Sequence, residues 1–188
     1  MFLLRRLHFL VDFCWNLGTY RPLLRLLRDR GVSPLDIFVK IAEWPRHDGR
    51  LAEFWKSFES QSRAEWFDTE DDIVEHYADA RRFDGLLRQD DDKLNILFGV
   101  IALRDYKNEF NSAILEHAAK CDGVLKRELD EVAEITFALF PPLDNDPQPS
   151  VFACGARAAR YLGLREWQPE DRAVRIEGGS GRLFVQGV

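Results

Sequence analysis

Cysteine, methionine and long apolar runs are scarce in this chain of 188 residues, which has three cysteines and one methionine. Three scattered cysteines do not make a disulfide framework, so we expect a reducing, cytoplasmic setting. No run of about 18 uninterrupted apolar residues occurs, and no transmembrane helix is expected. The opening stretch MFLLRRLHFLVDFCW is interrupted by Arg5, Arg6, His8 and Asp12 and no small-residue cleavage site follows it, which argues against a signal peptide.

An excess of positive charge is also missing, because the formal net charge is −6. This balance argues against broad nucleic-acid binding, which requires a basic face. Residues 1–30 are a local exception with six arginines and two aspartates, and Arg21, Arg25 and Arg28 fall on one helical face. That face indicates either contact with an anionic surface, such as lipid headgroups or an acidic protein, or the solvated side of an ordinary amphipathic helix.

Large apolar side chains are plentiful, with 46% hydrophobic residues, 14 phenylalanines and 5 tryptophans. A chain of this length and composition can bury a sizeable core in one domain with a small appendage. The pattern predicts an all-α fold, a multi-helix bundle of about six to seven helices with a short C-terminal helix and a β-hairpin appendage. We expect a helical bundle domain over residues 1–140, a proline-rich linker over 141–150 and a C-terminal tail over 151–188.

Periodicity and capping residues set the expected helices. They cover residues 2–17, 20–30, 34–44, 48–67, 69–89, 90–118 with a bend near 107–108, and 123–140. The helix over 48–67 has the clearest apolar stripe, made of Leu51, Phe54, Trp55, Phe58, Ser62 and Trp66. Thr69 precedes three acidic residues, which indicates an N-cap rather than a metal site. The run Asp90–Asp92 has the same interpretation.

The tail after the proline-rich stretch PPLDNDPQPS contains two further features. Ser150 is expected to cap a short helix that reaches Tyr161. Residues 173–186 are expected to form a β-hairpin around the loop GGSG, which lacks the spacing of a phosphate loop.

Few residues suggest catalysis or metal binding. Cys154 is expected in the first turn of a helix, where it is either a nucleophile of an independent hydrolase or a small buried thiol. His117 and Cys121 lie four residues apart and form at most half of a metal site; the alternative is a satisfied core or interface histidine. We assign no catalytic, cofactor-binding or metal-ligating residue from these patterns.

Two stretches resemble segments of one known family. They are HFLVDFCWNLGTYRPLLRLL, from His8 to Leu27, and FDGLLRQDDDKLNILFGVIALRDY, from Phe83 to Tyr106. Both are similar to parts of the helical C-terminal region of cobalamin-binding radical SAM proteins. The matching positions are Phe9, Phe13, Trp15, Asn16, Tyr20, Arg21, Pro22, Leu23 and Leu24 in the first stretch, and Leu86, Leu87, Asp92, Asn95, Ile96 and Leu97 in the second.

The resemblance implies an accessory part rather than a complete catalyst, since the cluster-binding motif CxxxCxxC and a cobalamin-binding DxHxxG signature are absent. A [4Fe–4S] cluster, S-adenosylmethionine and cobalamin are implied only for a partner or parent protein, and the chain would be its C-terminal domain, expressed separately or cut from it. The implied function is a non-catalytic helical accessory domain that contributes substrate-pocket or assembly contacts. Its partner would be the radical SAM catalytic domain or another copy of the chain.

The resemblance also implies candidate contacts to a partner or substrate. They are Phe13, Trp15, Asn16, Tyr20, Arg21, Arg25 and Asn95. We expect an exposed apolar face that includes Phe9, Phe13, Trp15 and Tyr20. Three alternatives are a self-contained helical interaction or regulatory module, the hydrolase built on Cys154, and a peripheral membrane protein anchored by the basic N-terminal helix.

Overall fold

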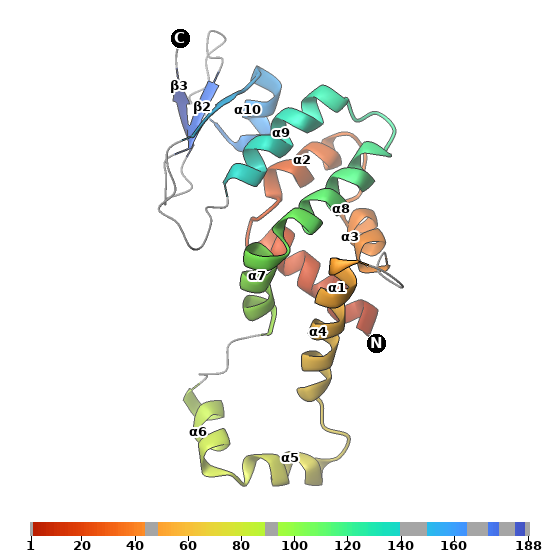
Figure 1. Cartoon of the computed structure of the whole chain (residues 1–188), viewed down its shortest axis with the longest axis vertical. Coiled ribbons are helices and arrows are strands. Elements are labelled where there is room, and N and C mark those ends of the chain that lie inside the picture. The colour runs from red at the N-terminus through yellow and green to blue at the C-terminus, as the bar shows by residue number, and fades with distance from the viewer. Residues whose placement is uncertain are drawn as a thin grey trace.

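Helices dominate the computed structural model of the protein (Figure 1). It describes residues 2–43, 49–88, 94–139, 150–164, 173–176 and 183–186. The helices of the body are α1 (Phe2–Leu10), the π-helical segment η1 (Val11–Asn16), α2 (Arg21–Asp29), α3 (Pro34–Glu43), α4 (Arg50–Ala64), α5 (Glu70–Tyr77), α6 (Ala80–Arg88), α7 (Leu94–Asp105), α8 (Lys107–Ala119) and α9 (Lys126–Ala138). The tail contains β1 (Ser150–Ala153), α10 (Ala156–Leu162), β2 (Ala173–Ile176) and β3 (Leu183–Gln186). The predicted all-α class is confirmed, with a short C-terminal helix and a β-hairpin.

More helices form than the sequence predicts, because two of the expected helices are each divided. The helix expected over 69–89 breaks between α5 and α6, where the Asp79 carboxylate accepts hydrogen bonds from the backbone N–H groups of Arg81 and Arg82. Asp79 is therefore an N-cap that starts a new helix. The second break lies at Tyr106, close to the expected bend.

The first helix changes its winding at Val11. The N–H of Leu17 donates to the carbonyl of Asp12, five residues back, at 2.8 Å, which is the π-helical pattern. Gly18 then ends the segment with φ of 82°, a left-handed conformation that glycine adopts at little energetic cost. This irregular turn places residues 12–17 differently from a continuous α-helix.

Aromatic side chains fill the core around Phe9. Its ring centroid lies 5.3 Å from those of Phe13 and Phe58 and 5.4 Å from that of Phe54. The predicted stripe of α4 faces this core, since Phe54, Trp55 and Phe58 are all buried. Large aromatic rings bury much apolar area, and α1, α4 and α8 are held together by these contacts.

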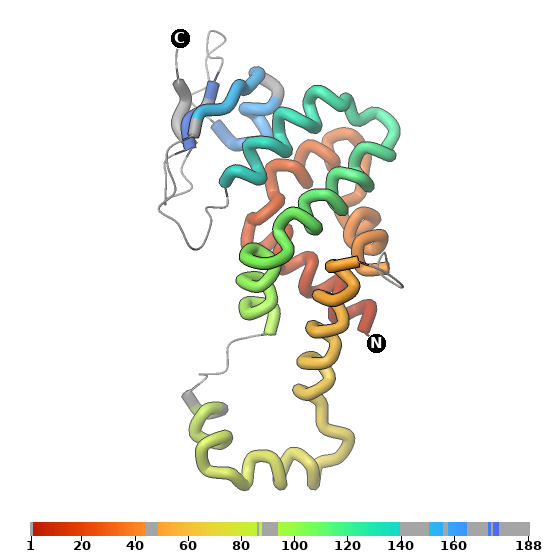
Figure 2. Tube along the Cα trace, in the orientation of Figure 1, coloured from red at the N-terminus to blue at the C-terminus, as the bar shows by residue number. Residues whose placement is uncertain are grey.

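Helices α5 and α6 form an arm that extends from the body beyond the ends of α4 and α7, as the chain trace shows (Figure 2). No residue of α5 is buried. The predicted cap is present: the side chain of Thr69 accepts from the N–H of Asp72, and the Asp72 carboxylate accepts from the N–H of Thr69. Local capping therefore supports α5 in place of tertiary packing.

The helix expected to begin at Ser150 is a wrong prediction. Residues 150–153 form strand β1, which pairs antiparallel with β2, and β2 pairs antiparallel with β3 in the order β1-β2-β3. The helix begins only after Gly155. Val151 and Phe152 favour extended backbone, and the predicted hairpin supplies the partner strand.

Helix α10 packs against α2 and α9 of the body, and its Ala158, Ala159 and Tyr161 belong to the same buried core. The proline-rich segment 141–149 lies outside the described residues, as do Trp44, Pro45 and the run Asp90–Asp92. The division into bundle, linker and tail therefore stays a prediction. Among the helices that the structure describes, none has the length and apolar character needed to cross a membrane.

Candidate functional site

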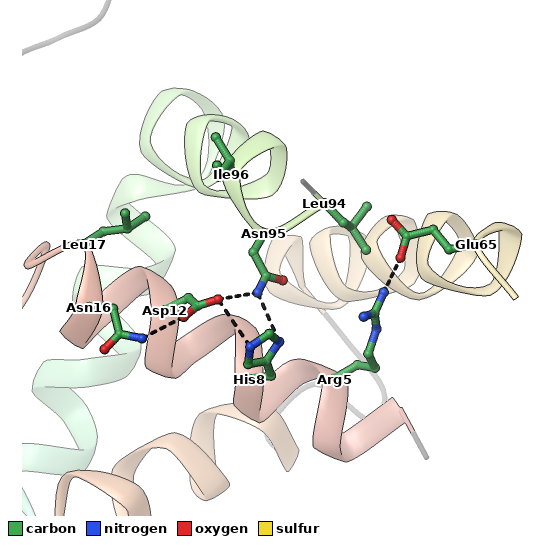
Figure 3. A pocket seen from close by; sticks show the side chains of 9 residues that line it. All are labelled: Arg5, His8, Asp12, Asn16, Leu17, Glu65, Leu94, Asn95 and Ile96. Carbon is green, nitrogen blue, oxygen red and sulfur yellow. Dashed lines mark hydrogen bonds and ion pairs between the residues drawn. The ribbon is translucent and has the colours of Figure 1, made fainter. Parts of the chain in front are cut away.

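A cavity of about 550 Å³ opens where the N-terminal helix meets the end of α4 and the start of α7 (Figure 3). We call it the N-terminal cavity. The residues that line it are Arg5, His8, Asp12, Asn16, Leu17, Glu65, Leu94, Asn95 and Ile96. Seven of them lie in the two stretches His8–Leu27 and Phe83–Tyr106, while Arg5 comes from α1 before the first stretch and Glu65 follows the end of α4.

The floor of the cavity is a polar network centred on the Asp12 carboxylate (Figure 3). Asn95 donates to Asp12 Oδ2 at 2.6 Å, and Asn16 donates to Asp12 Oδ1 at 2.7 Å. The Nε2 atom of His8 lies 3.4 Å from Asp12 Oδ2. Three side chains thus hold one carboxylate in a fixed position.

Helical spacing explains why these groups meet. His8, Asp12 and Asn16 follow each other at intervals of four residues, so they lie along one side of α1 and η1. Asn95 reaches them from the first turn of α7. The π-helical turn at residues 11–16 carries two of the four network members, and such turns occur often at functional sites.

Apolar side chains form the rim of the cavity. Leu17 and Ile96 are 62% and 50% exposed, whereas Leu94 is buried. At the other end, Arg5 pairs with Glu65 and donates from Nε to Ser62 Oγ at 2.7 Å. This bond explains why the apolar stripe of α4 contains one serine. The cavity therefore offers a polar floor, an apolar rim and an ion pair.

The network suits binding better than proton transfer. Asn95 offers its amide N–H group to His8 Nδ1 at 3.2 Å, so this ring nitrogen accepts and the proton of neutral His8 lies on Nε2, facing Asp12. Nδ1 is then occupied by Asn95, and Nε2 lies beside the Asp12 carboxylate. A general base needs a free nitrogen within reach of the substrate. His8 would have such a free nitrogen only if Asn95 moved away from its Nδ1 atom.

Of the predicted contact residues, the cavity brings together Asn16 and Asn95, through Asp12. Arg21 instead closes the turn before α2, because its guanidinium donates to the carbonyl groups of Trp15 and Asn16. Arg25 is exposed on α2 and does not line the cavity. The arginine side of α2 is the polar face of an amphipathic helix whose leucines are buried.

The prediction of an exposed apolar face is wrong. Phe9 and Tyr20 are fully buried, Phe13 is 1% exposed, and Trp15 is half-buried against the core. The hydroxyl of Tyr20 donates to Asn111 Oδ1 at 2.8 Å. These rings stabilise the body because α4, α8 and α9 cover them, and Phe13 and Tyr20 are not accessible to a partner.

Sequence reasoning missed His8, Asp12 and Arg5 as site residues. The spacing His8, Asp12, Asn16 was a usable signal, since polar residues at intervals of four on an otherwise apolar helix mark one shared side. The link to Asn95 had no such signal, because it joins residues 83 positions apart.

The three cysteines are free thiols, and none of them is fully exposed. Cys14 and Cys154 are buried and Cys121 is half-buried, and in the described part of the chain no three His, Cys, Asp or Glu side chains gather as metal ligands do. Burial raises the pKa of Cys14 far above its ordinary value, and burial together with Glu131 raises that of Cys154 to about 12. Protonated thiols are poor ligands and poor nucleophiles, which favours a small buried thiol at Cys154.

His117 is buried in α8, where Cys121 Sγ donates to its carbonyl oxygen at 3.2 Å. Burial, Lys120 and Lys40 lower the pKa of its imidazole. A buried, neutral histidine matches the core interpretation of this pair better than the metal interpretation.

Comparison with known proteins finds no match among protein-family models, curated proteins or solved structures.

Proposed function

We propose that this protein is a non-catalytic helical accessory domain of a cobalamin-dependent radical SAM system. It contributes contacts to a substrate pocket or to the assembly of the system. The radical chemistry would belong to a separate catalytic domain that supplies the [4Fe–4S] cluster, S-adenosylmethionine and cobalamin.

One observation carries the proposal: the two stretches that resemble the family meet at one cavity. His8, Asp12, Asn16 and Leu17 belong to the first stretch, and Leu94, Asn95 and Ile96 belong to the second. If the two stretches resembled the family only because both form packed helices, their matching polar residues would not be expected to lie close together. Here two of the matching polar residues, Asn16 and Asn95, both donate to the carboxylate of Asp12, which lies in the first stretch but is not one of the matching positions.

The chemistry of the cavity suits contact with another molecule. Leu17 and Ile96 present apolar side chains to solvent at the rim of the cavity, next to its polar floor. Interfaces and substrate pockets combine apolar area with a few fixed polar groups in this way. The carboxylate of Asp12 and the amide of Asn95 would orient a molecule that binds against Leu17 and Ile96.

The test is co-purification from the native source with an affinity tag on this chain. We expect a protein that carries CxxxCxxC to be recovered with it. Changing the rim with Leu17→Asp and Ile96→Asp together should abolish recovery, because two charges would replace the apolar contact. Leu35→Asp, at a residue 52% exposed on α3 and outside the cavity, is the matched control and should retain the partner. Recovery of this chain alone, without a CxxxCxxC protein, would reject the proposal.

A second candidate function is a self-contained helical interaction or regulatory module with no radical SAM link. The observation that favours it is the closed core, in which Phe9, Phe13 and Tyr20 are already covered by the chain itself. A protein of this kind would remain monodisperse and stable alone. It would bind, if at all, through side chains such as Ile73, Val74 and Phe83, which are exposed on the arm.

A further inference from the structure

The arm formed by α5 and α6 carries large apolar side chains that remain exposed. The two helices pack against each other and lie away from the body (Figure 1). Four of these side chains are at least 43% exposed: Ile73 and Val74 on α5, and Phe83 and Leu87 on α6. Phe83 and Leu87 are four residues apart, so they lie on one side of α6. Apolar side chains concentrated on two short consecutive helices indicate an interaction surface.

Packing within the chain gives the arm little stability. Helix α5 has eight residues, none of them buried, and α6 has nine. Isolated helices shorter than about 12–15 residues are marginally stable in water, and most helices in proteins depend on the packing of an apolar face. The cap at Thr69 compensates in part for α5. A second surface placed against both helices would supply the missing packing.

The charges of the arm indicate what kind of surface fits it. Helix α5 contains four acidic residues and no lysine or arginine, whereas α6 contains three arginines and one aspartate. Asp71 and Glu75 on α5 and Arg81 and Arg82 on α6 are exposed. None of these four side chains forms an ion pair with another residue that the structure describes, although Arg82 Nη1 lies 3.2 Å from His76 Nδ1.

An acidic helix followed directly by a basic helix is complementary to a second copy of the same pair. When two arms meet about a two-fold axis, α5 of each copy lies against α6 of the other, and both contacts join opposite charges. Contacts of α5 with α5, or of α6 with α6, would join like charges and are unfavourable. The charges therefore select a second copy and fix its orientation.

We propose that the arm is the interface of a homodimer, in which α5 of each copy packs against α6 of the other. Ile73, Val74, Phe83 and Leu87 lie at its apolar centre, between the acidic and basic side chains. A stable interface involves about 20–30 residues of each partner, and residues 66–88, the arm with the turn that leads into it, match that size. The inference does not depend on the proposed function, because no residue of the arm lines the N-terminal cavity.

The test is sedimentation equilibrium of the full chain alone. We expect monomer to predominate at about 1 μM and dimer at about 100 μM, with a shift toward monomer as salt screens the charges. Val74→Asp together with Leu87→Asp should weaken dimerisation at least about a hundredfold, because charges would enter the apolar contact. Leu125→Asp, at a residue 54% exposed before α9, is the matched control and should leave dimerisation unchanged.

Exchange of charge between the helices tests the orientation. One variant combines Asp71→Lys with Glu75→Lys, and the other combines Arg81→Glu with Arg82→Glu. Each alone should dimerise about tenfold more weakly than the wild type, because both copies lose their ion pairs. An equimolar mixture of the two should form a heterodimer about as tight as the wild-type dimer, since both contacts again join opposite charges.

Three results would overturn the proposal. The first is a wild-type chain that stays monomeric at about 100 μM, which would leave the arm to a different protein. The second is a dimer that Val74→Asp with Leu87→Asp does not weaken. The third is a mixture of the two charge variants that dimerises no better than either variant alone.

These side chains are all exposed, so the variants should keep the wild-type fold, and circular dichroism checks their helix content.

Discussion

Asp12 is the residue on which the floor of the N-terminal cavity depends. Its two carboxylate oxygens accept from Asn16 and Asn95, and His8 lies beside them. An asparagine at this position would place its own N–H group against the N–H groups of Asn16 and Asn95. We expect Asp12→Asn to lower the free energy of unfolding by about 1–3 kcal/mol.

Urea unfolding of the variant measures this change. Asp122→Asn is the matched control, because Asp122 is exposed in the turn between α8 and α9 and should change stability by less than about 0.5 kcal/mol. An Asp12→Asn protein as stable as the wild type would show that the network does not form.

Cys154 gives the stability a dependence on pH at the alkaline side. Burial, with Glu131 nearby, raises the pKa of its thiol from 9.0 to about 12 in the folded protein. The folded state then binds the proton more tightly than the unfolded state. The free energy of unfolding should be insensitive to this group below pH 9 and should fall as the pH rises from about 9 toward 12.

Unfolding of wild type and Cys154→Ala, measured between pH 7 and about 11, isolates this contribution. The difference in stability between the two proteins should shrink steadily above pH 9. A constant difference across this range would mean that the thiol is not buried.

Two of the contact residues predicted from the sequence line the N-terminal cavity. The resemblance pointed to Asn16 and Asn95, and both line the cavity. It pointed equally to Phe13 and Tyr20, which are core residues. A pattern of matching residues cannot separate positions kept for packing from positions kept for contact, because both appear as aromatic or polar matches.

At the scale of elements, α5 shows how much a cap matters where packing is absent. With no buried residue, this helix depends on the reciprocal bonds between Thr69 and Asp72. We expect Thr69→Ala to destabilise α5 by about 1 kcal/mol, with little effect on the body.

Hydrogen exchange resolves this local effect. The amides of α5 should exchange about fivefold faster in Thr69→Ala, while the amides of α8 keep their wild-type rates. Ser57→Ala, at an exposed position of α4, is the control and should change neither. Equal acceleration in α5 and α8 would show instead that the arm unfolds only with the whole molecule.

Most elements were predictable because their signals are local. Periodicity identified α4, and Gly18 and Gly31, both with positive φ, end helices where expected. Gly123 was expected to begin a helix, but it also has positive φ and α9 begins only at Lys126. The wrong prediction of a helix beginning at Ser150 has a different cause. Strand β1 is specified by its pairing with β2, whose paired residues lie 20 to 26 positions further along the chain, and periodicity within residues 150–153 does not report that partner.

At the scale of the whole molecule, the aromatic core around Phe9 joins helices from both halves of the body. Its ring contacts Phe13, Phe54, Phe58 and Phe110. Phe9→Ala should lower the free energy of unfolding by about 3–5 kcal/mol through the cavity it leaves. Domains of this size are stable by only about 5–15 kcal/mol, so the loss is severe.

Thermal unfolding tests this prediction with Phe83→Ala as the control. Phe83 is 46% exposed on the arm, and its removal should change stability by less than about 0.5 kcal/mol. Similar small effects of both substitutions would place Phe9 outside the core.

The central claim is that this chain acts beside a radical SAM catalyst, and the sequence of the source genome on either side of its coding region tests the claim most directly. The account predicts a coding sequence with CxxxCxxC, either in frame with this chain or adjacent to it. A neighbourhood without such a sequence would contradict the claim and leave the self-contained interaction module as the function.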